Sequence, residues 1–520
     1  MIATHRVKDT AGNNVGFIIN SRYFSYDFVK NNISEIDNLY VTSGGLVKSK
    51  SGKLDVISLL QVNRLRYKKL CEENPIQRDI QEEFSTWKTT RHTDILYVEG
   101  ARQTGKTTEI RKFAYNNYEQ VIYVNLSDKA QLDRFLTIVI NNASKLFGLS
   151  KYCKSTSEHD KYNDNPNTIL IIDEIQDSVE VYNSLRTLQS ELNCDIAVTG
   201  SFLGRTVNKE FFIPAGNTYN VEMTPLSFME FCRLYNADRL LTTIKLDGTS
   251  PVSNYNTLLE LYNVYKEIGG YPRVVKTYIK TKSTEACNDI FVDLLERFIQ
   301  ESRRYIGTDK SQLVFENMFK AAAIMQTREK KGTDNNIVEL TSKFINDSTR
   351  SIVDRKEVNT AIRWLVYNGV LGTCDLYNQG NVLELLPEKR IYFRDCVLLN
   401  YVLSNTAIDD ATRRGIIAET FAYNELYRLY KNRSKRIKGD KPCCSVFNNY
   451  ELDFMVVDNN DKKYGIEIKS GTTNNPKSLM EYRRNGFINI AIVAEITNGS
   501  IKAKWHSIPI YTVGARFPYT

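Results

Sequence analysis

A glycine-rich segment that begins at Gly100 has the residue types and spacing of a phosphate-binding loop. It reads G-x-x-x-x-G-K-T, with an apolar stretch before it and a helical pattern after it. Glycines let successive backbone N–H groups surround a phosphate chain, and the helix that follows directs the positive end of its dipole at the same anion. Lys106 is therefore predicted to reach the β- and γ-phosphates of a nucleoside triphosphate such as ATP, and the Thr107 hydroxyl to coordinate Mg²⁺. The residues predicted to bind the nucleotide are Gly100, Arg102, Gln103, Thr104, Gly105, Lys106, Thr107 and Thr108.

Two carboxylates follow the apolar segment 168–172, which the pattern predicts to be a buried strand. The carboxyl end of such a strand opens on the ligand crevice of a parallel sheet. There Asp173 is predicted to hold Mg²⁺, and Glu174 to activate the water that attacks the γ-phosphate. Ser201 follows the next apolar segment, 196–199, and is predicted to sense the γ-phosphate or to be an ordinary turn residue.

A second group of reactive side chains lies near the carboxyl end of the chain. Asp453 belongs to the apolar segment 451–457, and a turn at 458–461 leads to Glu467 and Lys469. Glu467 and Lys469 are two residues apart, so they project from the same face of a strand, and a hairpin would bring Asp453 beside them. Carboxylates with water suit Mg²⁺ or Mn²⁺, and Lys469 would position a metal-bound hydroxide against a phosphodiester.

Glu419, on the predicted helix 416–426, would supply a further metal ligand. The basic segment 431–438 lies between this helix and the two strands, where it would contact phosphates. Both features have plainer interpretations. A Glu-x-Lys pair on an edge strand can be a solvated ion pair, and a basic segment can serve solubility alone.

The composition is that of a globular protein with several domains. The chain has 520 residues, of which 42% are hydrophobic and 25% charged. No segment approaches the length of a membrane span, the start does not resemble a signal peptide, and the nine cysteines form no C-x-x-C pair. These features predict a cytoplasmic protein without a membrane partner. The net charge of +8 permits binding to nucleic acid without requiring it.

Changes of pattern divide the chain into five parts that would position these residues. The fold class predicted is α/β: a parallel-sheet P-loop NTPase core with a helical lid, a winged helix-turn-helix and a C-terminal α/β nuclease-like domain. For the winged helix, a lid helix with solvated charges is the alternative. The parts are an accessory domain of unknown role at 1–75, the core at 76–225, the lid at 226–305, the winged helix at 306–404 and the nuclease-like domain at 405–520.

Shorter patterns predict individual elements within these parts. Residues 6–19 predict a hairpin, and a charged stretch from about 62 to 87 predicts a helical segment. A turn at 269–273 should end one helix and begin another. The strands predicted for the core lie near 95–98, 121–126, 169–173 and 195–199.

Taken together, these motifs resemble the bacterial and archaeal AAA-type ATPases that carry a winged helix and a PD-(D/E)XK, restriction-endonuclease-like domain. In that family the Asp of the nuclease motif often follows Pro, whereas here Leu452 precedes Asp453. The resemblance covers about 88–480 and implies the parts of the protein rather than a biological role. The segments that carry it are 100–108, 171–176, 199–201, 225–228, 269–272, 389–395, 453–454 and 467–470.

The leading hypothesis is an ATP-hydrolysing protein associated with DNA, with a metal-dependent nuclease-like domain, in defence or DNA maintenance. The alternative is a nucleotide-driven signalling switch whose C-terminal domain binds nucleic acid without cleaving it. A scaffold that binds ATP without hydrolysis is a third, against which the intact pair Asp173 and Glu174 argues. Arg205 or Arg273 is predicted to act on the γ-phosphate, from a neighbouring subunit or from the lid, or else to form an ordinary surface ion pair.

Overall fold

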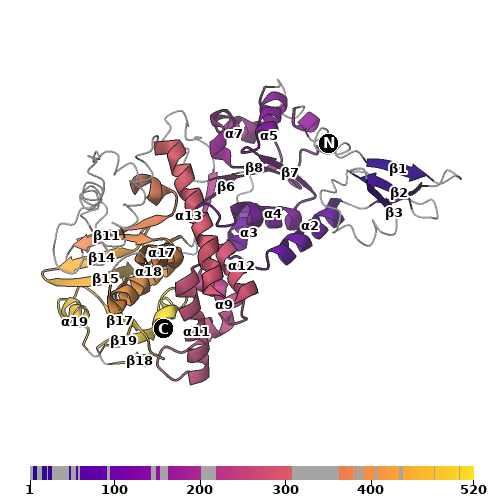
Figure 1. Cartoon of the computed structure of the whole chain (residues 1–520). Helices are drawn as coiled ribbons and strands as arrows, with labels where there is room; N and C mark the ends of the chain where they lie inside the picture. Colours follow the sequence, from indigo (N-terminus) through magenta and orange to yellow (C-terminus); the bar gives the residue numbers. More distant parts are fainter. Residues whose placement is uncertain are drawn as a thin grey trace, which may run out of the picture. The chain divides into compact units, whose positions relative to one another are not determined.

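The computed structural model divides into two compact units (Figure 1). One comprises Met1–Gly100 with Gly105–Met223, and the other Ala101–Thr104 with Thr224–Thr520. The residues that the structure describes are 4–8, 14–19, 22–25, 46–48, 54–56, 59–90, 94–141, 148–152, 162–200, 218–306, 322, 362–378, 381–382, 390–404, 408–431, 437–473, 475–502 and 504–519.

The core of the first unit is a parallel sheet, as the sequence predicts. Among the described residues it has five strands in the order β10-β6-β9-β8-β7, and every neighbouring pair is parallel. The strand β10 was not predicted from the sequence. Its side chains alternate between buried and more exposed positions, as expected at a sheet edge. The strands are β6 Ile95–Glu99, β7 Gln120–Asn125, β8 Thr168–Asp173, β9 Asp195–Gly200 and β10 Thr218–Glu222.

Burial explains why the central strands read as continuous apolar runs. The strands β8 and β9 are buried along their whole length, because helices cover both faces of the sheet. Alternate residues of β6 enter two different clusters: Tyr97 packs with α5 and α7, whereas Val98 packs with α3 and α4. These helices are α3 Ile80–Thr90, α4 Lys106–Asn117, α5 Lys129–Phe135 and α7 Val179–Glu191.

The amino-terminal segments agree with the predicted hairpin and correct the predicted helix. β1 Thr4–Lys8 and β2 Asn14–Ile19 pair in antiparallel fashion, and β3 Arg22–Ser25 extends them. The stretch predicted as one helical segment forms two helices, α2 Leu59–Glu73 and α3. Pro75 lies between them, and a proline disfavours helical backbone in the residue before it and lacks an N–H of its own. A further strand pair is β4 Leu46–Lys48 with β5 Leu54–Val56.

The second unit begins with helices. Ser227 and Glu230 form a capping box at the start of α9, and the predicted turn near Gly269 ends α11 and leads to Pro272 at the start of α12. The helices are α9 Phe228–Arg233, α10 Asp238–Thr243, α11 Val252–Ile268, α12 Pro272–Thr281 and α13 Thr284–Ile306. Among the described helices of the chain, none is both long and apolar enough to cross a membrane.

A mixed sheet dominates the rest of the second unit (Figure 1). Within the described residues it has nine strands, in the order β12-β11-β14-β15-β16-β17-β19-β18, with β13 paired to β11. The strands are β11 Leu371–Asn378, β12 Asn381–Val382, β13 Arg390–Phe393, β14 Cys443–Phe447, β15 Tyr450–Val457, β16 Lys463–Ile468, β17 Ile490–Glu495, β18 Ser500–Ile501 and β19 His506–Pro509. The helices around it are α17 Cys396–Ser404, α18 Asp410–Lys431 and α19 Lys477–Arg484.

This sheet crosses the predicted boundary between residues 404 and 405. The strand β11 pairs in antiparallel fashion with β13 and in parallel fashion with β14, so strands assigned to two predicted domains share one sheet. The winged-helix prediction depends on a helix at 355–365 and on a wing formed by 383–386 and 390–393. Residues 355–361 and 383–386 lie outside the described residues, whereas 390–393 form β13, which pairs with β11.

Candidate functional site

The phosphate-binding loop joins β6 to α4 through backbone that favours glycine. Gly100 and Gly105 both have positive φ, and a Cβ at Gly100 would overlap the carbonyl oxygen of Met223. The helix α4 begins at Lys106, so its first N–H groups and its dipole face the loop. The Lys106 ammonium donates to the Gly100 carbonyl at 3.1 Å and is thereby held at the loop.

The two predicted Mg²⁺ ligands of the first unit lie in contact. The Thr107 hydroxyl donates to the Asp173 carboxylate at 2.9 Å, and the Tyr123 hydroxyl donates to the same carboxylate at 2.6 Å. The Thr199 hydroxyl donates to its other oxygen. Helix α4 and the two neighbouring strands β7 and β9 therefore fix Asp173 at the end of β8. Hydroxyl and carboxylate oxygens are the hard ligands that suit Mg²⁺.

Sequence reasoning missed Tyr123 and Thr199. Burial and the adjacent Asp173 carboxylate raise the pKa of the Tyr123 phenol, so it remains a hydrogen-bond donor at neutral pH. Their signal in the sequence is weak, because a tyrosine or a threonine in a strand is common and only the order of the strands brings them to Asp173.

Glu174 has an unusual backbone conformation. Its φ of 54° lies in the left-handed region, which costs a residue other than glycine roughly 1 kcal/mol or more and is concentrated at functional sites. The Gln176 side chain donates to the Glu174 carboxylate and orients it. A Cβ at Gly200 would come within 2.6 Å of Oε1 of Gln176, so the absence of a side chain there makes room for Gln176.

The remaining residues predicted for nucleotide chemistry have mixed outcomes. Ser201 and Arg205 lie outside the described residues. Arg273 lies in α12, and its guanidinium is 3.3 Å from the Asp293 carboxylate on α13, with both side chains partly exposed. This contact agrees with the alternative of an ordinary ion pair.

In the second unit, an irregularity in the sheet occurs at Asp453. Cys443 pairs with Met455 and Ser445 pairs with Leu452, so β15 contains one residue more than β14 between these pairs. Such a bulge redirects side chains and is frequent beside active sites. Asp453 accepts a hydrogen bond from the Ile468 N–H at 2.7 Å, which ties it to the end of β16.

Glu467 and Lys469 lie together at that same end of β16. Their charged groups are 2.7 Å apart, and the Glu467 side chain is only 12% exposed. Burial raises the pKa of Glu467, Lys469 opposes that rise, and Asp453 adds to it. Its Oε2 is shielded from solvent and has no hydrogen-bond partner among the described residues. A buried oxygen without a partner is compatible with a cation that would complete the site.

Glu419 lies within electrostatic reach of this group from α18. Burial lowers the pKa of Lys469, but the carboxylates of Glu467, Asp453 and Glu419 outweigh burial and raise it. The structure thus brings the predicted catalytic residues of the second unit into one neighbourhood. Within the described residues, no group of three or more acidic, His or Cys side chains has metal-ligating geometry. Ligation of a metal here therefore stays a prediction.

The predicted basic segment is described only at its ends, because residues 432–436 lie outside the described part. Lys431 ends α18 and lies near the Tyr427 ring, with its Nζ 5.0 Å from the ring centroid. The ammonium of Lys438 pairs with Asp461 at 2.5 Å in the β15–β16 turn.

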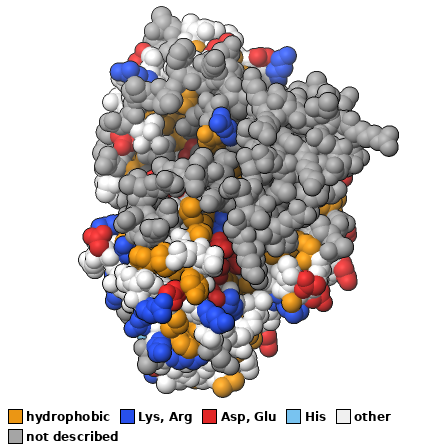
Figure 2. Space-filling view, turned by 90° about the vertical axis from the view of Figure 1, so that its left-hand side faces the viewer, with side chains coloured by type: hydrophobic (Ala, Val, Ile, Leu, Met, Phe, Trp, Pro, Cys, Tyr) orange, Lys and Arg blue, Asp and Glu red, His pale blue; other side chains and the backbone are white. Residues whose placement is uncertain are grey.

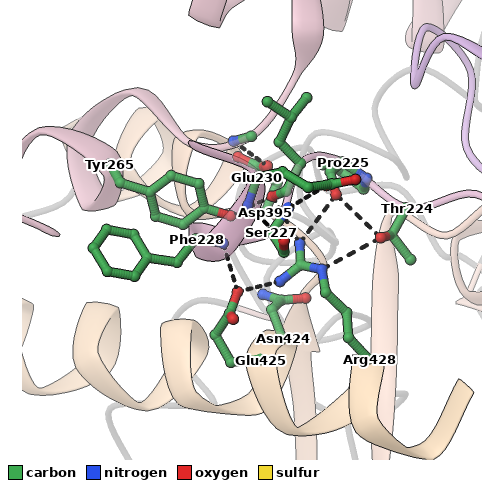
Figure 3. A network of polar contacts seen from close by, with 12 residues as sticks. Thr224, Pro225, Ser227, Phe228, Glu230, Tyr265, Asp395, Asn424, Glu425 and Arg428 are labelled. Atoms are coloured by element: carbon green, nitrogen blue, oxygen red, sulfur yellow. Dashed lines mark hydrogen bonds and ion pairs between the residues drawn. The ribbon is translucent and has the colours of Figure 1, made fainter. Parts of the chain in front are cut away.

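Three motif segments that the sequence left without a role converge on one buried network (Figure 3). The Leu226 N–H donates to the Gly270 carbonyl at 2.8 Å, and the Gly270 N–H donates to the Asp395 carboxylate at 2.7 Å. Arg428 of α18 donates to the Leu226 carbonyl at 3.0 Å and to Glu425 at 2.5 Å. These motif residues therefore join the lid helices to α17 and α18.

Comparison with family models identifies one domain. Residues 92–232 match an AAA domain, and residues 259–409 match a domain of unknown function. The first match contains the phosphate-binding loop and all five described strands of the parallel sheet. The chain therefore carries an AAA-type ATPase domain. Comparison with curated proteins gives no match.

Several solved structures are similar to this chain at low sequence identity. The Walker-type ATPase of Pyrococcus abyssi is 12% identical, with a TM-score of 0.39, over 63% of this chain and 96% of that chain. The Orc1 protein of Aeropyrum pernix in complex with DNA is 10% identical, with a TM-score of 0.28, over 57% of this chain and 85% of that chain. The RuvB Holliday junction branch migration motor of Thermotoga maritima is 12% identical, with a TM-score of 0.27, over 57% of this chain and 90% of that chain. With TM-scores this low, nothing about function follows from these likenesses.

Proposed function

We propose that the chain hydrolyses ATP and acts on DNA, with a metal-dependent nuclease-like site in its second unit. The observation that carries the ATPase part is the contact between Thr107 and Asp173 at the phosphate-binding loop, with Glu174 directly after Asp173 in the chain. The phosphate-binding loop, the Thr107 hydroxyl, the Asp173 carboxylate and the proposed base Glu174 then lie at one edge of a parallel sheet, within a domain of the AAA type.

Each residue of this site has a distinct part in hydrolysis. Lys106 and the loop N–H groups bind the β- and γ-phosphates and stabilise the charge that develops between them. Thr107 and Asp173 would hold Mg²⁺, which supplies further positive charge when bound. Glu174, oriented by Gln176, takes a proton from the attacking water.

The nuclease-like part is supported by Asp453, Glu467 and Lys469 at the end of β16. Two carboxylates would hold Mg²⁺ or Mn²⁺, and the ammonium would orient the attacking water toward a phosphodiester. The element order also supports it: helix α18, the antiparallel strands β14, β15 and β16, helix α19, then β17 parallel to β16. This order is compatible with the restriction-endonuclease-like domain that the motifs resemble.

A second candidate function has its own supporting observation. Lys469 is paired with Glu467, and the described residues contain no metal-ligating cluster. A domain that binds nucleic acid without cutting it, under control of the nucleotide, would not need a metal-ligating cluster at this position. Cleavage therefore separates the two candidates.

The ATPase test is the variant Lys106→Ala. It should abolish ATP binding or hydrolysis, because it removes the ammonium from the β- and γ-phosphates. The matched control is Lys129→Ala, an exposed lysine at the start of α5, which should leave turnover unchanged. Turnover of Lys106→Ala at the wild-type rate would show that the loop is not the nucleotide site.

The nuclease test uses the full chain with linear, circular and single-stranded DNA. Incubation with Mg²⁺ or Mn²⁺, with and without ATP, should produce nicks or breaks that chelation prevents. DNA that is bound but remains intact under every condition would favour the switch, and absence of DNA binding would reject both candidates.

A further inference from the structure

Basic side chains gather at one edge of the second sheet, where the parallel strands β16, β17 and β19 begin. We call this group the basic edge. Its members come from the approach to β16, the end of α19 and the segment before β19. They are Lys462, Lys463, Arg483, Arg484, Lys502 and Lys504.

The strand register brings these separate segments side by side. Tyr464 of β16 pairs with Ile490 of β17, and Ile492 of β17 pairs with His506 of β19. The amino ends of all three strands therefore lie along the same edge. The Asn489 N–H donates to the Lys463 carbonyl at 2.8 Å and joins the first two strands.

Side-chain contacts bring the basic groups closer still. The Arg483 guanidinium donates to the Lys504 carbonyl, so the end of α19 lies against the segment before β19. Burial lowers the pKa of His506, and the positive charges of Arg483 and Lys462 lower it further. Basic residues from two segments therefore act on an imidazole of the third.

Among the described residues, acidic side chains offset part of this charge, and one of them, Asp458, accepts a hydrogen bond from the Lys462 backbone N–H at 2.9 Å. Glu481 pairs with Arg484, and Asp461 pairs with Lys438, which lies outside the basic edge. Lys462, Arg483 and Lys504 are exposed. Figure 2 shows Lys and Arg side chains, with a few Asp and Glu among them, around an apolar area on the lower part of the face it draws, at the height of α19 and β18 in Figure 1. The basic edge thus presents a surplus of positive charge to solvent.

An aromatic ring lies within the basic edge. The Lys502 ammonium is 4.8 Å from the centre of the Trp505 ring. Ammonium and guanidinium groups beside an aromatic ring suit a nucleic acid, which offers both phosphates and bases. An acidic peptide or an anionic membrane would match the charge too, and we infer nucleic acid because the same domain carries the proposed nuclease-like site.

The basic edge is separate from the candidate metal centre. Glu467 and Lys469 lie at the carboxyl end of β16, whereas Lys462 and Lys463 lie at its amino end. A strand of this length spans roughly 15–20 Å. We propose that the basic edge binds the phosphodiester backbone of nucleic acid and holds the substrate of the proposed nuclease-like domain. The inference rests on the proposed function, because it takes its ligand from there.

The test is a charge reversal at two exposed positions, Lys462→Glu with Lys504→Glu, in the full chain. Binding of a fluorescent DNA duplex and of single-stranded DNA is measured over a salt series, with chelator present to prevent cleavage. The double variant should bind about tenfold or more weakly, and the slope of log affinity against log salt should decrease by ~0.9 for each duplex phosphate that the variant no longer neutralises. The matched control reverses two exposed lysines of the lid, Lys245→Glu with Lys280→Glu, and should bind as the wild type does.

The outcomes separate the basic edge from the proposed function. If the affinity for DNA and the salt slope are unchanged in the double variant, the basic edge does not bind DNA. That result would leave the proposed function unaffected. If the double variant binds phosphatidylserine vesicles or polyglutamate more weakly than the wild type but binds DNA equally well, the partner of the basic edge is not nucleic acid. A wild-type protein that binds DNA through the basic edge without cutting it would reject the nuclease activity and support the basic edge.

Discussion

Asp173 and Glu174 are consecutive carboxylates with different surroundings. Asp173 accepts hydrogen bonds from Thr107, Tyr123 and Thr199, so it is fixed where an ion would share the Thr107 oxygen. Glu174 is held by Gln176 on a left-handed backbone that follows the strand. These surroundings fit an ion ligand and a general base respectively.

This difference predicts different defects for the two amide variants. Glu174→Gln should bind ATP normally and hydrolyse it roughly 10²-fold or more slowly, because a positioned base is lost. Asp173→Asn should weaken Mg²⁺-dependent binding instead. Nucleotide binding and single-turnover hydrolysis, measured over a Mg²⁺ series, distinguish the two. Equal losses of binding in both variants would contradict the assignment.

Asp395 predicts a dependence of stability on pH. Burial raises its pKa to about 6, although the N–H groups of Val397 and Gly270 and the charge of Arg428 lower it. The folded state therefore binds this proton more tightly than the unfolded chain, whose carboxyl keeps the ordinary value of 3.8. The stabilisation from Asp395 is fully present below the ordinary value and is lost as the pH rises through about 6.

The variant Asp395→Asn removes this titration. Its unfolding free energy should fall less with rising pH than that of the wild type, by up to ~2–3 kcal/mol across this pH range. Urea unfolding from about pH 4 to about pH 7 measures the difference. Parallel pH profiles for the two proteins would show that Asp395 does not titrate in this range.

At the scale of elements, Gly270 determines how closely two segments of the second unit approach. A Cβ there would overlap the backbone carbonyl of Leu226, which also accepts hydrogen bonds from Arg428 and Tyr265. A backbone carbonyl that accepts several hydrogen bonds can move only at a substantial cost in free energy. The glycine is therefore required by the close approach of these two segments.

Gly270→Ala should accordingly lower the free energy of unfolding by ~1–3 kcal/mol. Gly471→Ala is the matched control, because a Cβ there would meet nothing within 4 Å. It should change stability by about 0.5 kcal/mol or less. Denaturant midpoints of the two variants provide the comparison, and a similar loss in both would mean that the close approach to Leu226 is not the cause.

At the scale of the whole molecule, Lys106, Asp173 and Glu174 belong to the first unit, whereas Asp453 and Lys469 belong to the second, and each unit has a core of its own. We predict that Asp453→Ala and Lys469→Ala remove Mn²⁺-dependent cleavage and leave ATP hydrolysis largely unchanged, because neither residue belongs to the first unit. Asp461→Ala, on the exposed tip of the same hairpin, is the control and should retain both activities. Nicking and ATPase rates are measured side by side. A matching fall in ATPase rate would show that the substitutions act on folding.

The sequence by itself determined the features that are encoded in consecutive residues. A glycine–lysine loop between a strand and a helix, and an apolar run that ends in two carboxylates, identify the nucleotide site because their chemistry depends on local spacing. Four strands of the core were predicted for the same reason. β10 was missed, because Thr218–Glu222 alternates polar and apolar residues and contains no apolar run.

Only the tertiary structure decided which distant residues meet. Tyr123 and Thr199 reach Asp173 because the strand order places β7 and β9 on either side of β8. Asp453 is redirected by a bulge that depends on the partner strand β14. The basic edge exists because parallel pairing aligns the starts of three strands that are far apart in the chain. Pairing and packing between such segments depend on the free energy of the whole fold, and a local pattern of residues does not specify them.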